Sequence, residues 1–119
     1  MNNMNLSAED EAVLRENLKK CSQETIDAAV SFRKTGNIAL ITPIVLGILE
    51  RFAEDDKKPL LKNPSDDMVI TDELGFDSLT MVEIVLAVEE AIGTSIDNDD
   101  IATLRTLGDI KSYIAKKVA

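Results

Sequence analysis

The sequence predicts an all-α fold, a small helical bundle preceded by a helical extension. Of its 119 residues, 45% are apolar but only 3% are aromatic, so leucine, isoleucine, valine and alanine have to fill the core. Helix-forming residues dominate and long β-branched alternations are missing, which favours helices over strands. The length suits one small domain with an appendage. We expect the extension in residues 1–36 and the bundle in residues 37–119.

Residues 1–36 have the periodicity of an amphipathic helical segment. Ser7 begins a capping-box pattern, and Lys34 and Gly36 form a basic last turn followed by a helix stop. Ser22 can cap a second helix, so the segment is either one helix with a weak coiled-coil seam or a hairpin of two. Its periodic positions are Leu14, Leu18, Cys21, Thr25, Ala28 and Phe32. Such a face needs a burial partner, so we expect packing on the bundle, away from the serine described below, or self-association with another copy.

In the bundle, capping residues and proline mark the first helix and the connection after it. We expect Thr42 to cap a helix that has Pro43 at its first position and ends near Phe52. The long charged connection that follows, residues 53–71, has to be pinned by apolar residues of its own. These are Leu60, Leu61, Met68 and Ile70.

The remaining chain predicts two further long helices and a short one. The second long helix runs from Ser78 to Ile92, where a glycine follows as a stop signal. A short acidic turn of helix begins near Asp97 and ends near Leu104. Thr106 is expected to cap the last helix.

The helix that begins at Ser78 has apolar and acidic residues on different sides. Apolar side chains at helical spacing predict a wide apolar face: Leu79, Met81, Val82, Val85, Leu86, Val88 and Ile92. The opposite strip, expected to be exposed and acidic, contains Thr80, Glu83, Ala87 and Glu90. Asp77-Ser78 alone is an ordinary N-cap signature, because either side-chain oxygen can accept a free backbone N–H.

Charge and composition exclude several classes of function. The net charge is −9 with no histidine, which argues against nucleic-acid binding, because phosphate neutralisation requires basic clusters. Cys21 is the only cysteine, so neither an internal disulfide nor a metal–thiolate cluster is available. A calcium loop starting at Asp97 would need glycine and glutamate where Ala102 and Gly108 stand. We therefore expect no permanently bound metal ion.

The sequence gives no indication of a membrane segment. Its longest apolar run, residues 38–49, is interrupted by Pro43 and is too short to span a bilayer. The N-terminus lacks the basic-then-apolar layout of a signal peptide. We expect a cytoplasmic protein without stable membrane insertion.

Two neighbouring motifs resemble those of acyl carrier proteins. L-G-F-D-S-L at residues 74–79 matches that family's attachment motif, and V-E-I-V follows at residues 82–85. The similarity covers about the last two-thirds of the chain. It implies an acyl-carrier-like four-helix bundle of three longer helices and one short, with 4′-phosphopantetheine attached covalently to Ser78 by a phosphopantetheinyl transferase. It also implies that Asp77 helps to hold Mg²⁺ during this transfer.

The resemblance implies a carrier and not an enzyme, and the chain has no histidine base that could activate Ser78 as a nucleophile. We expect a free-standing protein that holds acyl intermediates as thioesters for fatty-acid or polyketide-type lipid biosynthesis. The alternatives are an aminoacyl or peptidyl carrier, and a carrier-like interaction module that is never modified. The residues around Ser78 lack the G-G-x-S pattern of peptidyl carriers, which favours an acyl load.

Negative charge is concentrated around Ser78. Between residues 63 and 104 there is no Lys or Arg to offset Asp66, Asp67, Asp72, Glu73, Asp77, Glu83, Glu89, Glu90, Asp97, Asp99 and Asp100. Such a surface speeds association with basic patches, so we expect acyl-chain synthesising enzymes with basic docking patches as partners. Their expected contacts are Leu79, Glu83, Leu86 and Glu90. Thr80 stands where fatty-acid carriers often have an acidic residue, which leaves the identity of the partners open.

Overall fold

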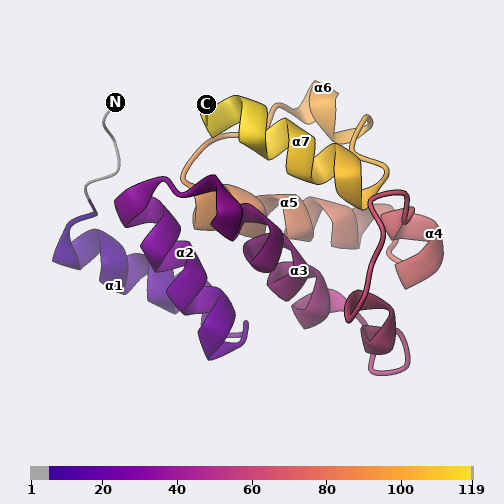
Figure 1. The fold of residues 1–119 in the computed structure, drawn as a ribbon, viewed down its shortest axis with the longest axis horizontal. Coiled ribbons are helices and arrows are strands. Elements are labelled where there is room, and N and C mark those ends of the chain that lie inside the picture. The colour runs from indigo at the N-terminus through magenta and orange to yellow at the C-terminus, as the bar shows by residue number, and fades with distance from the viewer. Residues whose placement is uncertain (1–5, 119) are drawn as a thin grey trace.

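The computed structural model describes residues 6–118, and every regular element in this range is a helix (Figure 1). In chain order these are α1 (Ala8–Asn17), α2 (Gln23–Thr35), the 3₁₀ turn η1 (Ile38–Leu40), α3 (Ile41–Phe52), the 3₁₀ turn η2 (Lys58–Leu61), α4 (Ile70–Leu74), α5 (Ser78–Ile92), α6 (Asn98–Ile101) and α7 (Leu107–Val118). The predicted all-α class is confirmed. No helix in this range has the length and hydropathy needed to cross a membrane.

The predicted extension is a hairpin of two helices, α1 and α2. The Asp10 N–H donates to Ser7 Oγ at 3.0 Å and the Thr25 N–H donates to Ser22 Oγ at 3.2 Å, so each hydroxyl caps its helix. α2 ends at Gly36, whose φ of 72° lies in the left-handed region that favours glycine. Of the two arrangements that the sequence allowed, the two-helix hairpin is therefore the correct one.

The predicted start of α3 is wrong. Asn37 accepts a hydrogen bond from the Ala39 N–H at 3.1 Å and begins η1, which continues without a break into α3. Thr42 therefore lies inside the helix and does not cap it. Pro43 is the third residue of α3, which begins at Ile41. A proline is tolerated there because the first N–H groups of an α-helix have no intrahelical partner to lose.

The hairpin and the carrier-like helices share one hydrophobic core. α2 lies against both α3 and α5, α1 also contacts α5, and α7 packs on α3 (Figure 1). The largest fully buried side chains come from both parts of the chain: Leu14, Leu18, Phe32, Ile44, Val45, Ile48, Leu49, Ile70, Ile84, Leu107 and Ile114. The expectation that the extension packs on the bundle is confirmed. The division of the chain at residue 36 stays a prediction.

The long connection before α4 is held against the start of α7. The Ile70 N–H donates to the Arg105 carbonyl at 3.0 Å, and the Leu107 N–H donates to the Met68 carbonyl at 3.0 Å. The predicted pinning residues that are buried are Leu61, Met68 and Ile70. The prediction is wrong for Leu60, which is exposed because η2 turns only one of its two leucines inward. The two backbone hydrogen bonds and the three buried side chains fix α4 and the loop that leads to α5.

The C-terminal half largely follows the prediction. The Asp109 N–H donates to Thr106 Oγ1 at 3.0 Å and the Asp109 carboxylate accepts the Thr106 N–H at 3.1 Å, a reciprocal cap for α7. The three longer helices and the short one implied by the resemblance correspond to α3, α5, α7 and α6. α4 is an additional short helix that the sequence pattern did not predict.

Gly47 allows α2 to approach α3 closely, because a Cβ at this position would lie 1.9 Å from Thr25 Oγ1. Replacing glycine by alanine inside a helix normally stabilises by about 1 kcal/mol. Here overpacking dominates, so Gly47→Ala should lower the free energy of unfolding by about 1–3 kcal/mol. Thermal melts test this, with Ser112→Ala on the exposed face of α7 as the control. A Gly47→Ala protein as stable as wild type would contradict this packing of the hairpin.

Candidate attachment and docking site

A tight turn delivers Ser78 to the surface. α4 ends at Leu74 and is followed by Gly75, whose φ of 72° favours glycine. The next residue, Phe76, is buried and anchors the turn. The backbone is extended at Asp77, and α5 begins at the next residue. Ser78 is therefore exposed at the N-terminus of a helix of 15 residues.

Asp77, and not Ser78, caps α5. Its Oδ1 accepts a hydrogen bond from the Thr80 N–H at 2.8 Å. This backbone hydrogen bond is the main cause that lowers the pKa of Asp77, so the carboxylate is charged at neutral pH. The ordinary capping explanation of the Asp77-Ser78 pair is satisfied by the aspartate alone. The Ser78 hydroxyl is therefore not required for capping.

The N-terminus of α5 suits a phosphate attached to Ser78. The N–H groups of the first turn of a helix lack intrahelical partners, and the positive end of the helix dipole lies beside them. Both features stabilise an anion at this position. The charged Asp77 opposes that anion, and a cation bound at its carboxylate would relieve the repulsion. The residues present therefore fit a phosphopantetheine group and the Mg²⁺ expected during its transfer.

Three apolar side chains of α5 lie in solvent, and here the predicted apolar face is wrong. Leu79, Val82 and Leu86 are 69%, 45% and 58% exposed. The side chains that α5 turns to the core are Met81, Ile84, Val85, Val88, Ala91 and Ile92. α5 carries more apolar residues than one helix face can bury, so spacing alone could not separate the two groups. We call the exposed residues Leu79, Val82, Glu83 and Leu86 the docking strip.

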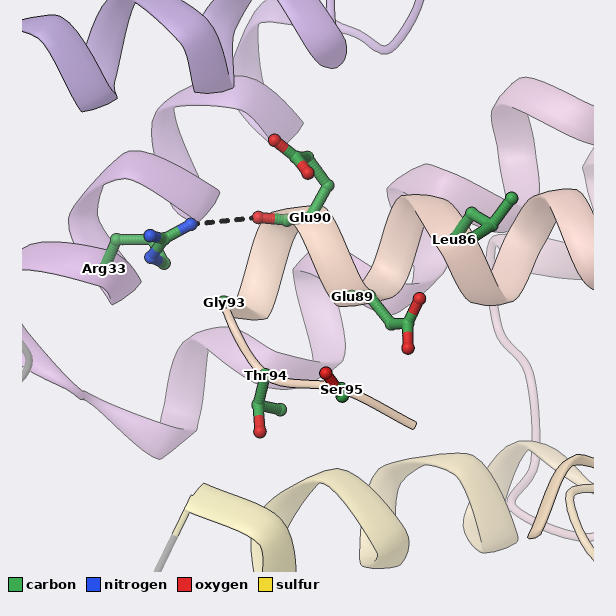
Figure 2. A pocket seen from close by; sticks show the side chains of 7 residues that line it. All are labelled: Arg33, Leu86, Glu89, Glu90, Gly93, Thr94 and Ser95. Carbon is green, nitrogen blue, oxygen red and sulfur yellow. Dashed lines mark hydrogen bonds between the residues drawn. The ribbon is translucent and has the colours of Figure 1, made fainter. Parts of the chain in front are cut away.

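Only one residue of the predicted acidic stripe is fully exposed. This residue is Glu83, whereas Thr80 and Glu90 are half-buried and Ala87 is buried. The hairpin covers the end of α5 that contains Glu90. The Asn17 amide donates to Glu90 Oε1. Arg33 donates to the Glu90 carbonyl at 3.0 Å, and Figure 2 shows this second contact. The expectation of a fully exposed stripe is wrong because it took no account of where the extension packs.

A hollow at the end of α5 and a small cavity beneath this helix differ in size and polarity. Figure 2 shows the hollow, about 680 Å³, which is lined by Arg33, Leu86, Glu89, Glu90, Gly93, Thr94 and Ser95. The cavity is about 10 Å³ and is lined by Met81, Ile84, Val85, Val88, Ile96, Leu104, Ile110 and Ile114, all apolar. A cavity of this size is barely large enough for one water. An acyl chain could enter only if the surrounding helices moved apart.

Comparison with known families identifies the part of the chain that carries this site. Residues 45–114, more than half of the chain, match the family model described as "Phosphopantetheine attachment site". The chain belongs to the acyl carrier protein family. The predicted family is thus confirmed, as is its covalently attached 4′-phosphopantetheine. The match contains all of α5 and leaves out the hairpin.

Curated relatives are similar over a shorter stretch. The acyl carrier protein of Acidothermus cellulolyticus is 51% identical over 45 residues, which are 38% of this chain and 54% of that protein. The acyl carrier protein of Syntrophobacter fumaroxidans is 46% identical over 50 residues, 42% of this chain and 62% of that protein. The meromycolate extension acyl carrier protein of Mycolicibacterium aurum is 49% identical over 45 residues, 38% of this chain and 46% of that protein. The chain thus spans about half the length of the curated relatives it matches, and no solved structure matches it significantly.

Two variants of Asp77 should separate its capping role from its charge. Asn caps a helix as well as Asp, so Asp77→Asn should keep the melting temperature at neutral pH but slow arm transfer on the order of tenfold through weaker Mg²⁺ binding. Asp77→Ala should lower both the melting temperature and the rate of arm transfer. Because the folded-state pKa of Asp77 is lowered, its stabilisation is present at neutral pH and is lost as the pH falls through that value, a loss absent from Asp77→Asn. Melts against pH and transferase kinetics measure these effects, and unchanged kinetics in Asp77→Asn would exclude a role of the charge.

Proposed function

We propose that this chain is a carrier that holds acyl intermediates as thioesters on a 4′-phosphopantetheine arm attached to Ser78, in fatty-acid or polyketide-type lipid biosynthesis. The observation that carries the proposal is the exposed hydroxyl of Ser78 at the start of α5, next to an aspartate that already caps the helix. The names of the relatives support a role in lipid biosynthesis: all three are acyl carrier proteins, and one serves meromycolate extension.

Attachment requires one substitution at phosphorus, carried out by a separate transferase. Ser78 Oγ forms the new P–O bond, the P–O bond to the nucleotide part of coenzyme A breaks, and a base of the transferase accepts the serine proton. The chain itself positions the serine and stabilises the phosphodiester at the helix N-terminus. The arm thiol then holds the cargo, and the chain performs no chemistry on it.

The interior favours an acyl cargo over an aminoacyl one. The cavity under α5 is lined by apolar side chains only, so a charged amino group would be buried there without a partner. The segment between two residues that line the cavity, Ile96 and Leu104, contains α6, a helix of four residues that is tied to α7 by a hydrogen bond from the Tyr113 hydroxyl to Asp100 Oδ2 at 2.6 Å. So short a helix is easily displaced, which gives the cavity a way to enlarge around an acyl chain.

The docking strip suits transient contact with several enzymes. It combines exposed apolar side chains with the charge of Glu83, beside the proposed attachment site. Negative charge accelerates association with basic patches, and the contact is weakened by salt. We infer that the transferase and the acyl-chain synthesising enzymes dock on this strip.

Self-association through the hairpin has less support. The hairpin's largest apolar side chains, Leu14, Leu18 and Phe32, are already buried within the chain. Val13 is 56% exposed, but a single apolar residue does not make an interface. Cytoplasmic localisation stays a prediction from the sequence.

Ser78→Ala should abolish loading of the arm. Incubation with coenzyme A and a phosphopantetheinyl transferase should add one phosphopantetheinyl mass to the wild-type chain and none to Ser78→Ala, as measured by intact mass. Ser112→Ala removes an exposed serine on α7 and should be loaded like wild type. Circular dichroism should show both variants fully helical. Loading of Ser78→Ala would refute the assignment, and a wild-type chain that gains no mass would favour the interaction module that is never modified.

A further inference from the structure

A second surface hollow is built by three helices, one of which belongs to the hairpin. It has a volume of about 280 Å³ and lies between α1, α3 and α5. Its lining is Asn17, Arg51, Phe52, Glu83, Leu86, Ala87 and Glu90. It therefore contains three of the four side chains predicted from the sequence to contact partners, Glu83, Leu86 and Glu90. The docking strip is thus continuous with a wall supplied by α1.

The hairpin binds α5 without neutralising its carboxylates. Asn17 contacts Glu90 through a neutral amide, and Arg33 binds the backbone carbonyl of Glu90 instead of its carboxylate. Three other cations of the hairpin are paired within it: Arg15 with Glu11 and Asp27, Lys19 with Glu16, and Lys34 with Glu11. Among residues 6–118, no salt bridge engages Glu83 or Glu90. Both charges remain available to a partner.

The lining of the hollow matches one type of side chain. Arg51 is the only basic residue in it, and its guanidinium lies 4.2 Å from the centroid of the Phe52 ring. Two carboxylates against one cation leave the hollow negative, while Phe52 and Leu86 provide apolar surface. A lysine or arginine has the complementary form, because its apolar stem packs on such surface and its charged head binds carboxylates.

We propose that the hairpin completes the docking surface of this carrier, and that the hollow between α1, α3 and α5 takes a lysine or arginine side chain of the partner enzyme. Asn17 acts as a positioning residue, because its amide holds the Glu90 carboxylate at the rim. This proposal rests on the proposed carrier function and extends it to the hairpin, which lies outside the family match.

An enzyme that docks on Ser78 can also cover this hollow. With a rise of about 1.5 Å per residue, Glu83 lies about 7.5 Å and Glu90 about 18 Å from Ser78 along the axis of α5. A standard protein interface of about 800 Å² per partner is wide enough to include all three residues. A phosphopantetheinyl transferase with coenzyme A is therefore a suitable probe, although the enzymes that supply the acyl group are unidentified.

Steady-state kinetics of arm transfer test the role of Asn17. Asn17→Ala should raise the KM for the carrier about two- to fivefold with kcat unchanged, the range expected for one exposed polar contact. The difference should shrink at high salt, where exposed charges are screened. In a Glu90→Gln background, Asn17→Ala should have no further effect, because it acts through that carboxylate. Glu83→Gln should raise KM as well.

Gln23→Ala is the matched control. In the wild-type chain the Gln23 amide also donates to a carboxylate of the hairpin, Asp27 Oδ1 at 2.9 Å. Gln23 does not line the hollow, so the KM of Gln23→Ala should equal that of wild type. An unchanged KM for Asn17→Ala, while Glu83→Gln raises it, would overturn the proposal and leave the carrier function standing. A lower melting temperature or kcat in Asn17→Ala without a change in KM would show a structural role only. A wild-type chain that is never loaded would refute the carrier function itself.

Discussion

The structure depends on α5 being buried on one side and open on the other. Ala91 and Val88 of this helix lie in the core, whereas Leu79 and Leu86 remain in solvent. The buried side is where hairpin and carrier helices meet, so the energy that folds the chain also fixes the direction in which the exposed side points. Ser78 lies at the N-terminus of this helix, so the same packing fixes its orientation. A serine modified as proposed would thus be held in place by the packing of α5.

The two ends of α5 differ: one end carries exposed negative charge, and the other end is covered by the hairpin. Near Ser78 the helix is open, with Asp77 as its cap and Glu83 exposed, so negative charge is available there for the proposed contact with partners. At the other end the hairpin approaches, and neutral or backbone contacts to Glu90 hold it in place. Had the hairpin used its cations on these carboxylates, it would have weakened the proposed docking surface. Arg15, Lys19 and Lys34 are instead paired within the hairpin, and in residues 6–118 no salt bridge engages Glu83 or Glu90.

Local signals predicted much of this, and tertiary packing explains what they missed. The caps Ser7, Ser22 and Thr106 were found because a cap depends on residues three apart. The start of α3 was missed because Asn37 offers an earlier cap than Thr42. The buried and exposed sides of α5 could not be told apart from the sequence, because this helix has more apolar residues than one helix face can hold. The covering of Glu90 could not be predicted at all, because it depends on where a distant hairpin packs.

Hydrogen exchange on the chain alone, and on the chain saturated with a phosphopantetheinyl transferase in the absence of coenzyme A, tests the central claim most directly. The claim is that hairpin and α5 form one surface for partners. The account predicts added protection in two separate segments: the first turns of α5, and the end of α1 around Asn17, with α7 unchanged. Protection restricted to α6 and α7, or to α5 without the end of α1, would contradict it.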